Sequence, residues 1–152
     1  MTYAHAYELA RLMYDPKAPA HVLAYWRFHV SGALTFLMGA DINWKGPCSI
    51  FIQETAFGTS PAVLKGNNLF GISHADPETG KWEPNHYPCV IRCCEAFLRL
   101  LHAPNYRDAW DNRQLPPVFL EKLHRAKPSY NANPTWLTGC LAANELIRKI
   151  VE

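Results

Sequence analysis

Apolar side chains recur at intervals of three and four residues along most of the chain, which is the period of an amphipathic helix. The spacing in residues 2–14 predicts a first helix that ends at Asp15-Pro16, because the residue before a proline avoids helical backbone angles. A second helix is predicted from near Pro19 to Val30, with its aromatic residues in the core. These aromatic residues are Tyr25, Trp26 and Phe28.

The helical period returns in shorter segments after a loop predicted over residues 39–46. One helix begins near Pro47 and ends between residues 58 and 61. Later helices begin at Val90, at Pro116-Pro117 and after Asn133-Pro134. On each of these three helices the apolar residues are predicted to form a stripe that faces the core. The stripes are Cys94, Phe97, Leu98 and Leu101 on the first helix, Phe119, Leu120 and Leu123 on the second, and Leu137, Leu141, Ile147 and Ile150 on the last.

Residues 73–88 have no helical period. The sequence Asp-Pro-Glu-Thr-Gly at residues 76–80 has the composition of a tight turn, with proline after the first residue and glycine at the end. Short extended arms on either side predict a small hairpin that forms a flap over a cleft. Because no repeat or linker divides the chain, we predict one domain over residues 1–152, mainly α with a small β part (α+β).

Composition narrows the classes of function. The chain has 152 residues, of which 49% are hydrophobic and 18% charged, as in a folded domain with a sizeable core. A net charge of +2 is too small to indicate a nucleic-acid partner. No segment approaches the roughly 20 apolar residues of a membrane span. The first residues lack the basic and apolar regions of a signal peptide, so we expect a protein made in the cytoplasm, without membrane association.

The five cysteines indicate neither a metal site nor a disulfide framework. None of them forms a Cys-x-x-Cys pair, and their neighbours are mostly apolar. We therefore expect small buried side chains, with no metal and no cofactor. They are Cys48, Cys89, Cys93, Cys94 and Cys140.

Glu54 is the first candidate for chemistry. It is the only charged residue between Lys45 and Lys65, and it follows an apolar run at residues 50–52. A carboxyl in such a run loses hydration, which favours the protonated form that a general acid needs. The alternative is a helix-end glutamate that simply reaches solvent. Gly-Asn-Asn-Leu-Phe-Gly-Ile at residues 66–72 favours the first interpretation, because its glycines and amides suit a tight turn that lines a polar cleft.

Two motifs in this region resemble the glucosaminidase family of peptidoglycan hydrolases, which includes the flagellar muralytic enzyme and autolysin glucosaminidase domains. Gln-Glu-Thr-Ala-Phe-Gly at residues 53–58 resembles the family's Leu-Glu-Ser/Thr-Gly-Trp-Gly, and Asn-Asn-Leu-Phe-Gly-Ile at residues 67–72 matches its second motif fully. Gln53, Ala56 and Phe57 depart from the first motif. With similar stretches at residues 87–106 and 129–136, the resemblance covers roughly residues 45–150. It implies a lysozyme-like helical domain with a small β-hairpin lobe over the active-site cleft.

The resemblance also implies roles for individual residues. Glu54 is the expected general acid, and Tyr130 corresponds to the family's active-site tyrosine, with a structural aromatic as the alternative. The second catalytic group is expected on the hairpin, at Glu83 beside a possible sugar-stacking tryptophan, or else at Glu78. Attack by water or by the substrate's own N-acetyl group stays open. The expected substrate-binding residues are Asn67, Asn68, Phe70, Trp82 and Tyr87, although Phe70 also suits the core.

The sequence thus predicts a hydrolase of peptidoglycan glycan strands, first of all an N-acetylglucosaminidase. The alternatives are a muramidase or lytic transglycosylase, and a catalytically inactive glycan-binding module. A wall-cutting enzyme without a visible export signal suggests a type VI secretion effector that acts in the periplasm of a target cell. Its expected partner is a periplasmic immunity protein that covers the cleft. A phage endolysin is the other route.

Overall fold

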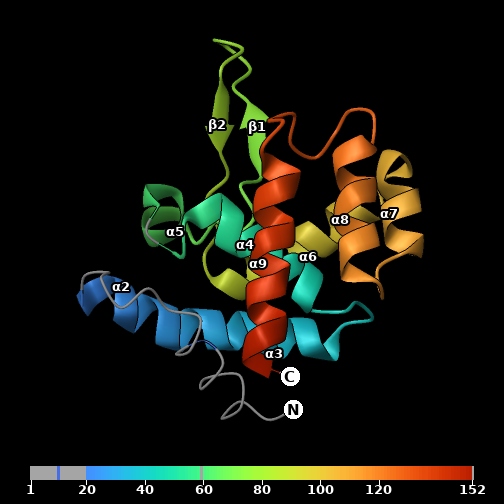
Figure 1. The fold of residues 1–152 in the computed structure, drawn as a ribbon. Helices are drawn as coiled ribbons and strands as arrows, with labels where there is room; N and C mark the ends of the chain where they lie inside the picture. Colours follow the sequence, from blue (N-terminus) through green and yellow to red (C-terminus); the bar gives the residue numbers. More distant parts are fainter. Residues whose placement is uncertain (1–9, 11–19, 59, 152) are drawn as a thin grey trace.

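The protein is mainly helical, with a small two-stranded antiparallel hairpin (Figure 1). The computed structural model describes residue 10 and residues 20–58 and 60–151. The helix predicted over residues 2–14 and its end at Asp15-Pro16 lie, apart from residue 10, outside the described residues. In chain order the elements are α2 (Ala20–Tyr25), a π-helical turn (Trp26–Val30), α3 (Ser31–Gly39), α4 (Lys45–Thr55), α5 (Pro61–Gly66), β1 (Ser73–Ala75), β2 (Trp82–Pro84), α6 (Val90–Leu101), a 3₁₀ turn (Pro104–Tyr106), α7 (Arg107–Asp111), α8 (Pro116–Arg125) and α9 (Trp136–Val151).

Helix α9 runs along the middle of the molecule and packs most extensively on α4 (Figure 1). The close approach depends on Gly139, because a Cβ there would lie 1.9 Å from the Gln53 side chain of α4. Helix α8 packs on both helices, with the Phe119 ring against Gly46 of α4. These contacts fix the end of α4, which carries Glu54, against the start of α9.

The predicted apolar stripes of α6 and α8 are largely confirmed. Leu98 is only partly buried, while the other predicted positions of these two helices are buried. On α9 the prediction is wrong for Leu141, which is 38% exposed. The other three predicted positions are confirmed, since Ile147 is buried and Leu137 and Ile150 pack partly buried against the core. The buried stripe consists of Trp136, Cys140, Ala143 and Ile147.

The second predicted helix is longer than expected and changes its winding. It continues from α2 through the π-helical turn into α3 and ends at Gly39, so the loop predicted after that residue is confirmed. The prediction that Phe28 lies in the core is wrong, since its side chain is 65% exposed. A π-helical turn has more residues than an α-turn, so a face predicted from a constant 3.6-residue period falls out of phase there.

The hairpin lies at one end of the molecule, opposite α2 and α3 (Figure 1). Ser73 pairs with Pro84 and Ala75 with Trp82, as expected for antiparallel strands. Asp76 closes the turn, because its Oδ1 accepts hydrogen bonds from the backbone N–H groups of Glu78 and Thr79. These bonds hold the pKa of the Asp76 carboxyl below its ordinary value. The predicted hairpin is confirmed.

No helix among residues 20–58 and 60–151 combines the length and the apolar character needed to cross a membrane.

The core supports one direct prediction of stability. Phe97 is fully buried and stacks on Phe70 at 4.1 Å between ring centroids, whereas Phe28 is mostly exposed. Phe97→Ala is expected to lower the free energy of unfolding by about 3–5 kcal/mol. The matched change Phe28→Ala is expected to cost under about 1 kcal/mol. Urea denaturation of both variants checks this, and similar losses would contradict the placement of Phe28.

Candidate active site

The carboxyl of Glu54 has two different oxygen environments. Glu54 is partly buried at the end of α4. Its Oε1 accepts hydrogen bonds from the Asn131 Nδ2 amide at 3.0 Å and from the Trp136 Nε1 indole at 2.7 Å. Two N–H donors satisfy the two lone pairs of a carboxyl oxygen. Any proton transfer by this carboxyl is therefore left to Oε2.

Oε2 lies against Gly71. A Cβ built on this glycine would stand 2.5 Å from Oε2, and the backbone has φ +65°, a conformation that favours glycine. The two conditions together explain why a glycine follows Phe70. Gly71 is itself exposed, so Oε2 lies against a residue of the protein surface.

Asn68 shapes this loop from inside. Its Nδ2 donates to the backbone oxygens of Ile72 at 2.8 Å and Asn85 at 3.0 Å, and its Oδ1 accepts from the Ile72 N–H at 3.1 Å. The side chain is fully buried. The second amide, Asn67, takes a left-handed conformation at the end of α5, and its Nδ2 donates to the Tyr87 backbone oxygen at 2.9 Å. Both amides join the loop to the base of the hairpin.

A groove of about 720 Å³ runs beside this loop. Its walls come from the Gly71 loop, the hairpin, the end of α6 and the loop before α9. Glu54 itself does not line the groove, but it contacts Gly71 and hydrogen-bonds Asn131, which do. The lining residues are Gly71, Ile72, Ser73, Trp82, Leu100, Tyr106, Pro128, Ser129, Tyr130, Asn131 and Ala132.

The hairpin presents two different faces. Ser73, Ala75, Trp82 and Pro84 share one face by the strand register, and Trp82 is 74% exposed at the groove. Glu83 is exposed and lies on the opposite face, because neighbouring residues of a strand point to opposite sides. The structure therefore brings Trp82 to the groove and leaves Glu83 away from it. Glu78 is exposed in the turn and is likewise absent from the groove lining.

Tyr130 links the groove to the loop that holds Gly71. Its hydroxyl donates a hydrogen bond to the Phe70 backbone oxygen. Burial, followed by the nearby Glu54 carboxylate, raises the pKa of the Tyr130 hydroxyl well above its ordinary value. The hydroxyl therefore stays protonated at neutral pH, which this donation requires.

The other predicted substrate-binding residues do not line the groove. Phe70 is 1% exposed and packs in the core, so only its backbone takes part in the site. Tyr87 is partly buried, and its hydroxyl accepts from the Asn85 Nδ2 at 3.2 Å. With Asn67 and Asn68, these residues shape the loop but are not groove-lining.

Sequence reasoning missed Asn131 and Trp136, the two donors to Glu54. One signal was available for Trp136: it opens a helix as a large aromatic with one N–H, and a buried indole needs an acceptor. No such signal marks Asn131, because its bond to Glu54 spans 77 positions of the chain. Tyr106, at the groove wall, was not predicted as a site residue either.

None of the five cysteines lines the groove. All five have free thiols, and four are buried as predicted, while the prediction fails for Cys89, which is exposed before the first turn of α6. Burial raises the pKa of Cys93 to about 11 and that of Cys140 further. Within the part of the chain that the structure describes, no three His, Cys, Asp or Glu side chains are grouped as metal ligands.

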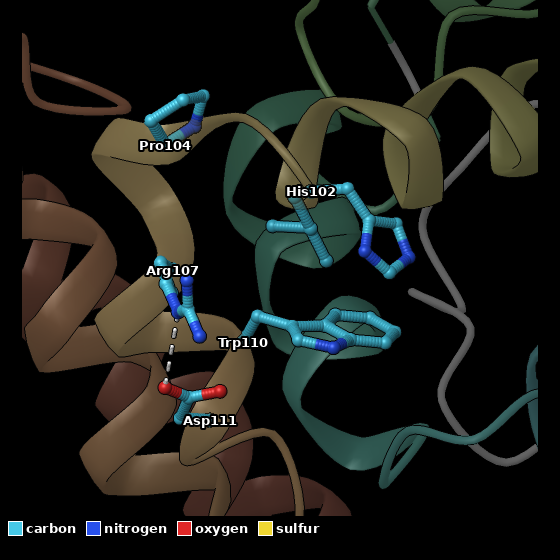
Figure 2. A pocket seen from close by; sticks show the side chains of 6 residues that line it. His102, Pro104, Arg107, Trp110 and Asp111 are labelled. Carbon is cyan, nitrogen blue, oxygen red and sulfur yellow. Dashed lines mark ion pairs between the residues drawn. The ribbon is translucent and has the colours of Figure 1, made fainter.

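A second hollow, of about 470 Å³, lies beside the 3₁₀ turn (Figure 2). Arg107 and Asp111 form an exposed ion pair at 3.9 Å on one side of it, and the rings of His102 and Trp110 contact each other on the other side. Its two opposite charges face each other, and Glu54 is not part of it. The groove beside Glu54 is therefore the better candidate site.

Comparisons of the chain with protein-family models, with curated proteins and with solved structures give no match.

Proposed function

We propose that the groove beside Glu54 binds and cleaves a peptidoglycan glycan strand, and that the protein is a lysozyme-like glycoside hydrolase, most specifically an N-acetylglucosaminidase. One observation carries the proposal: a partly buried carboxyl has one oxygen held by two N–H donors, while the other lies against a groove-lining glycine. Such a carboxyl is oriented for proton transfer at Oε2. The exposed Trp82 on the groove wall offers an aromatic face for a sugar ring.

In this proposal Glu54 acts as general acid. The proton on Oε2 passes to the glycosidic oxygen as the bond from that oxygen to the anomeric carbon breaks. The leaving sugar departs as an alcohol, and positive charge develops on the anomeric carbon and ring oxygen. A water molecule then adds to the anomeric carbon, and its released proton returns to Glu54. The acid is thereby regenerated.

The groove favours a route that needs only one protein carboxyl. Among the described residues that line it, none is an aspartate or glutamate, and Glu83 lies on the far face of the hairpin. The positive charge can be met by the neighbouring N-acetyl oxygen of the substrate, as in substrate-assisted hydrolases. Attack by a hydroxyl of the same sugar, as in a lytic transglycosylase, is the other single-carboxyl route.

The composition of the groove lining favours a second candidate, a glycan-binding module without catalysis. A groove with an exposed tryptophan and no lining carboxylate suits binding alone. Purified cell walls separate the two. Hydrolysis is expected to lower the turbidity of a wall suspension within hours. A module that only binds would sediment with the walls and leave their turbidity unchanged.

Delivery to a target cell's periplasm and an immunity protein over the groove stay predictions. Periplasmic expression is expected to lyse cells, and cytoplasmic expression to be harmless. Lysis by the cytoplasmic form would instead favour an endolysin.

A further inference from the structure

We infer that the segment from Tyr130 to Trp136 is a clamp that positions the acid, with Asn131 and Trp136 as positioning residues for Glu54 and Tyr130 as a positioning residue for Gly71. The catalytic meaning of this clamp depends on the proposed function. Its structural part, the control of one carboxyl by two donors, does not.

The clamp contacts Glu54 at a single atom. Asn131 and Trp136 come from the loop before α9 and from its first turn, and both donate to Oε1. The torsion about the last bond of a glutamate is broad, so an unheld carboxyl would exchange its oxygens. Two donors on Oε1 make it the carbonyl-like oxygen of a protonated carboxyl and leave the proton on Oε2. The clamp thus selects which oxygen faces Gly71.

Tyr130 adds a second point of control. Its hydroxyl binds the Phe70 oxygen, which belongs to the peptide that joins Phe70 to Gly71. This bond fixes the glycine against which Oε2 lies. Trp136 is 1% exposed, and its ring centroid lies 5.5 Å from that of Tyr130. The two rings pack against each other. The Gly71 loop, held by Tyr130, and the Glu54 carboxyl, held by Trp136, are therefore positioned by the same segment.

The titratable groups near Glu54 come from the clamp, from α9 and from α8. The Tyr130 hydroxyl and the Cys140 thiol face Glu54, and burial raises the pKa of both. His124 packs behind Trp136 with 6.1 Å between ring centroids. Within the described residues no ion pair to Glu54 is formed.

Asn131→Asp tests the clamp without removing the turn that contains it. The Oδ1 of Asn131 accepts the Asn133 N–H at 2.9 Å, and aspartate keeps this acceptor. The change replaces an N–H donor by a second carboxyl oxygen at about the same 3.0 Å from Glu54. Two carboxyls at that separation share a proton, so Glu54 is expected to keep its proton to a higher pH.

The measurement is the ¹³C NMR titration of the Glu54 side-chain carboxyl. In Asn131→Asp the midpoint is expected to rise by about one pH unit or more. In Trp136→Phe, which removes the indole N–H, it is also expected to rise. The matched control is Asn133→Asp, which makes the same substitution two residues away and keeps its acceptor for Thr135. There the midpoint is expected to stay close to that of the wild type.

Activity on cell walls supplies the second reading. If Glu54 is the acid, the alkaline limit of the pH–rate profile should rise in Asn131→Asp, and kcat should fall more than tenfold with little change in KM. Equal Glu54 midpoints in Asn131→Asp and Asn133→Asp would overturn the clamp. A shifted midpoint in a protein that never cleaves walls would instead overturn the proposed function and leave the carboxyl control intact.

Discussion

Glu54→Gln is expected to abolish the lysis of purified cell walls while the fold stays intact. Glutamine keeps the Oε1 acceptor for Asn131 and Trp136, so both hydrogen bonds can persist. It places an amide where Oε2 lies against Gly71, and an amide cannot protonate a leaving oxygen. The expected loss is at least the roughly 10²–10⁴-fold that general acid catalysis contributes. Turbidity rates and circular dichroism of wild type and variant measure both parts.

The matched control for this change is Glu83→Gln. Glu83 lies on the hairpin face turned away from the groove, opposite His74 in the register. Its removal is expected to change the rate by less than about threefold, because surface changes away from the site have small effects. A loss as large as that of Glu54→Gln would show that the hairpin brings Glu83 to the substrate, as the sequence analysis predicts. Full activity of Glu54→Gln would remove the acid assignment.

Gly71→Ala is expected to have the second largest effect. The new Cβ would stand 2.5 Å from Oε2 of Glu54, a separation that nonbonded atoms do not tolerate. Either the carboxyl or the loop must move by several tenths of an ångström or more, and a displacement near 1 Å can cost about 10²-fold in rate. Substitution at φ +65° also strains the backbone by about 1–2 kcal/mol.

Gly80→Ala is the control that separates the effect of the contact with Oε2 from the effect of backbone strain. Gly80 has φ +67°, close to that of Gly71, but a Cβ there meets nothing within 4 Å. Both variants should therefore lose a similar amount of stability from backbone strain, and only Gly71→Ala should lose activity. Melting temperature and turbidity rate give the two readings. Equal activity in the two alanine variants would show that the position of Oε2 against Gly71 is not needed for catalysis.

The sequence predicted most of the elements because local signals are strong in this chain. The turn at residues 76–80 contains its own cap, since Asp76 accepts from the backbone two and three residues ahead. Pro116 marks the start of α8, as predicted, whereas α5 and the 3₁₀ turn were not predicted although each also begins at a proline. Such signals act within a few residues, so they can be read without knowledge of the tertiary fold. The class of fold, mainly helical with one hairpin, followed from them.

The site itself was only partly predictable. The position of Glu54 near the end of its helix was expected, but its two hydrogen-bond donors come from residues 77 and 82 positions away. Contacts of that kind depend on how α4 and α9 pack. The placement of Glu83 could have been foreseen, because adjacent residues in a strand cannot both face one cleft. Trp82 and Glu83 were therefore competing candidates for the groove.

Mass spectrometry of the fragments released from purified peptidoglycan tests the central claim most directly. Wild type and Glu54→Gln are incubated with the same walls, and the soluble products are compared. The proposal predicts glycan fragments that end in reducing GlcNAc from the wild type and none from the variant. Ends in reducing MurNAc or anhydro-MurNAc would keep Glu54 as the acid but change the bond or the route. No fragments from the wild type, or the same fragments from both proteins, would contradict a glycan hydrolase with Glu54 as its acid.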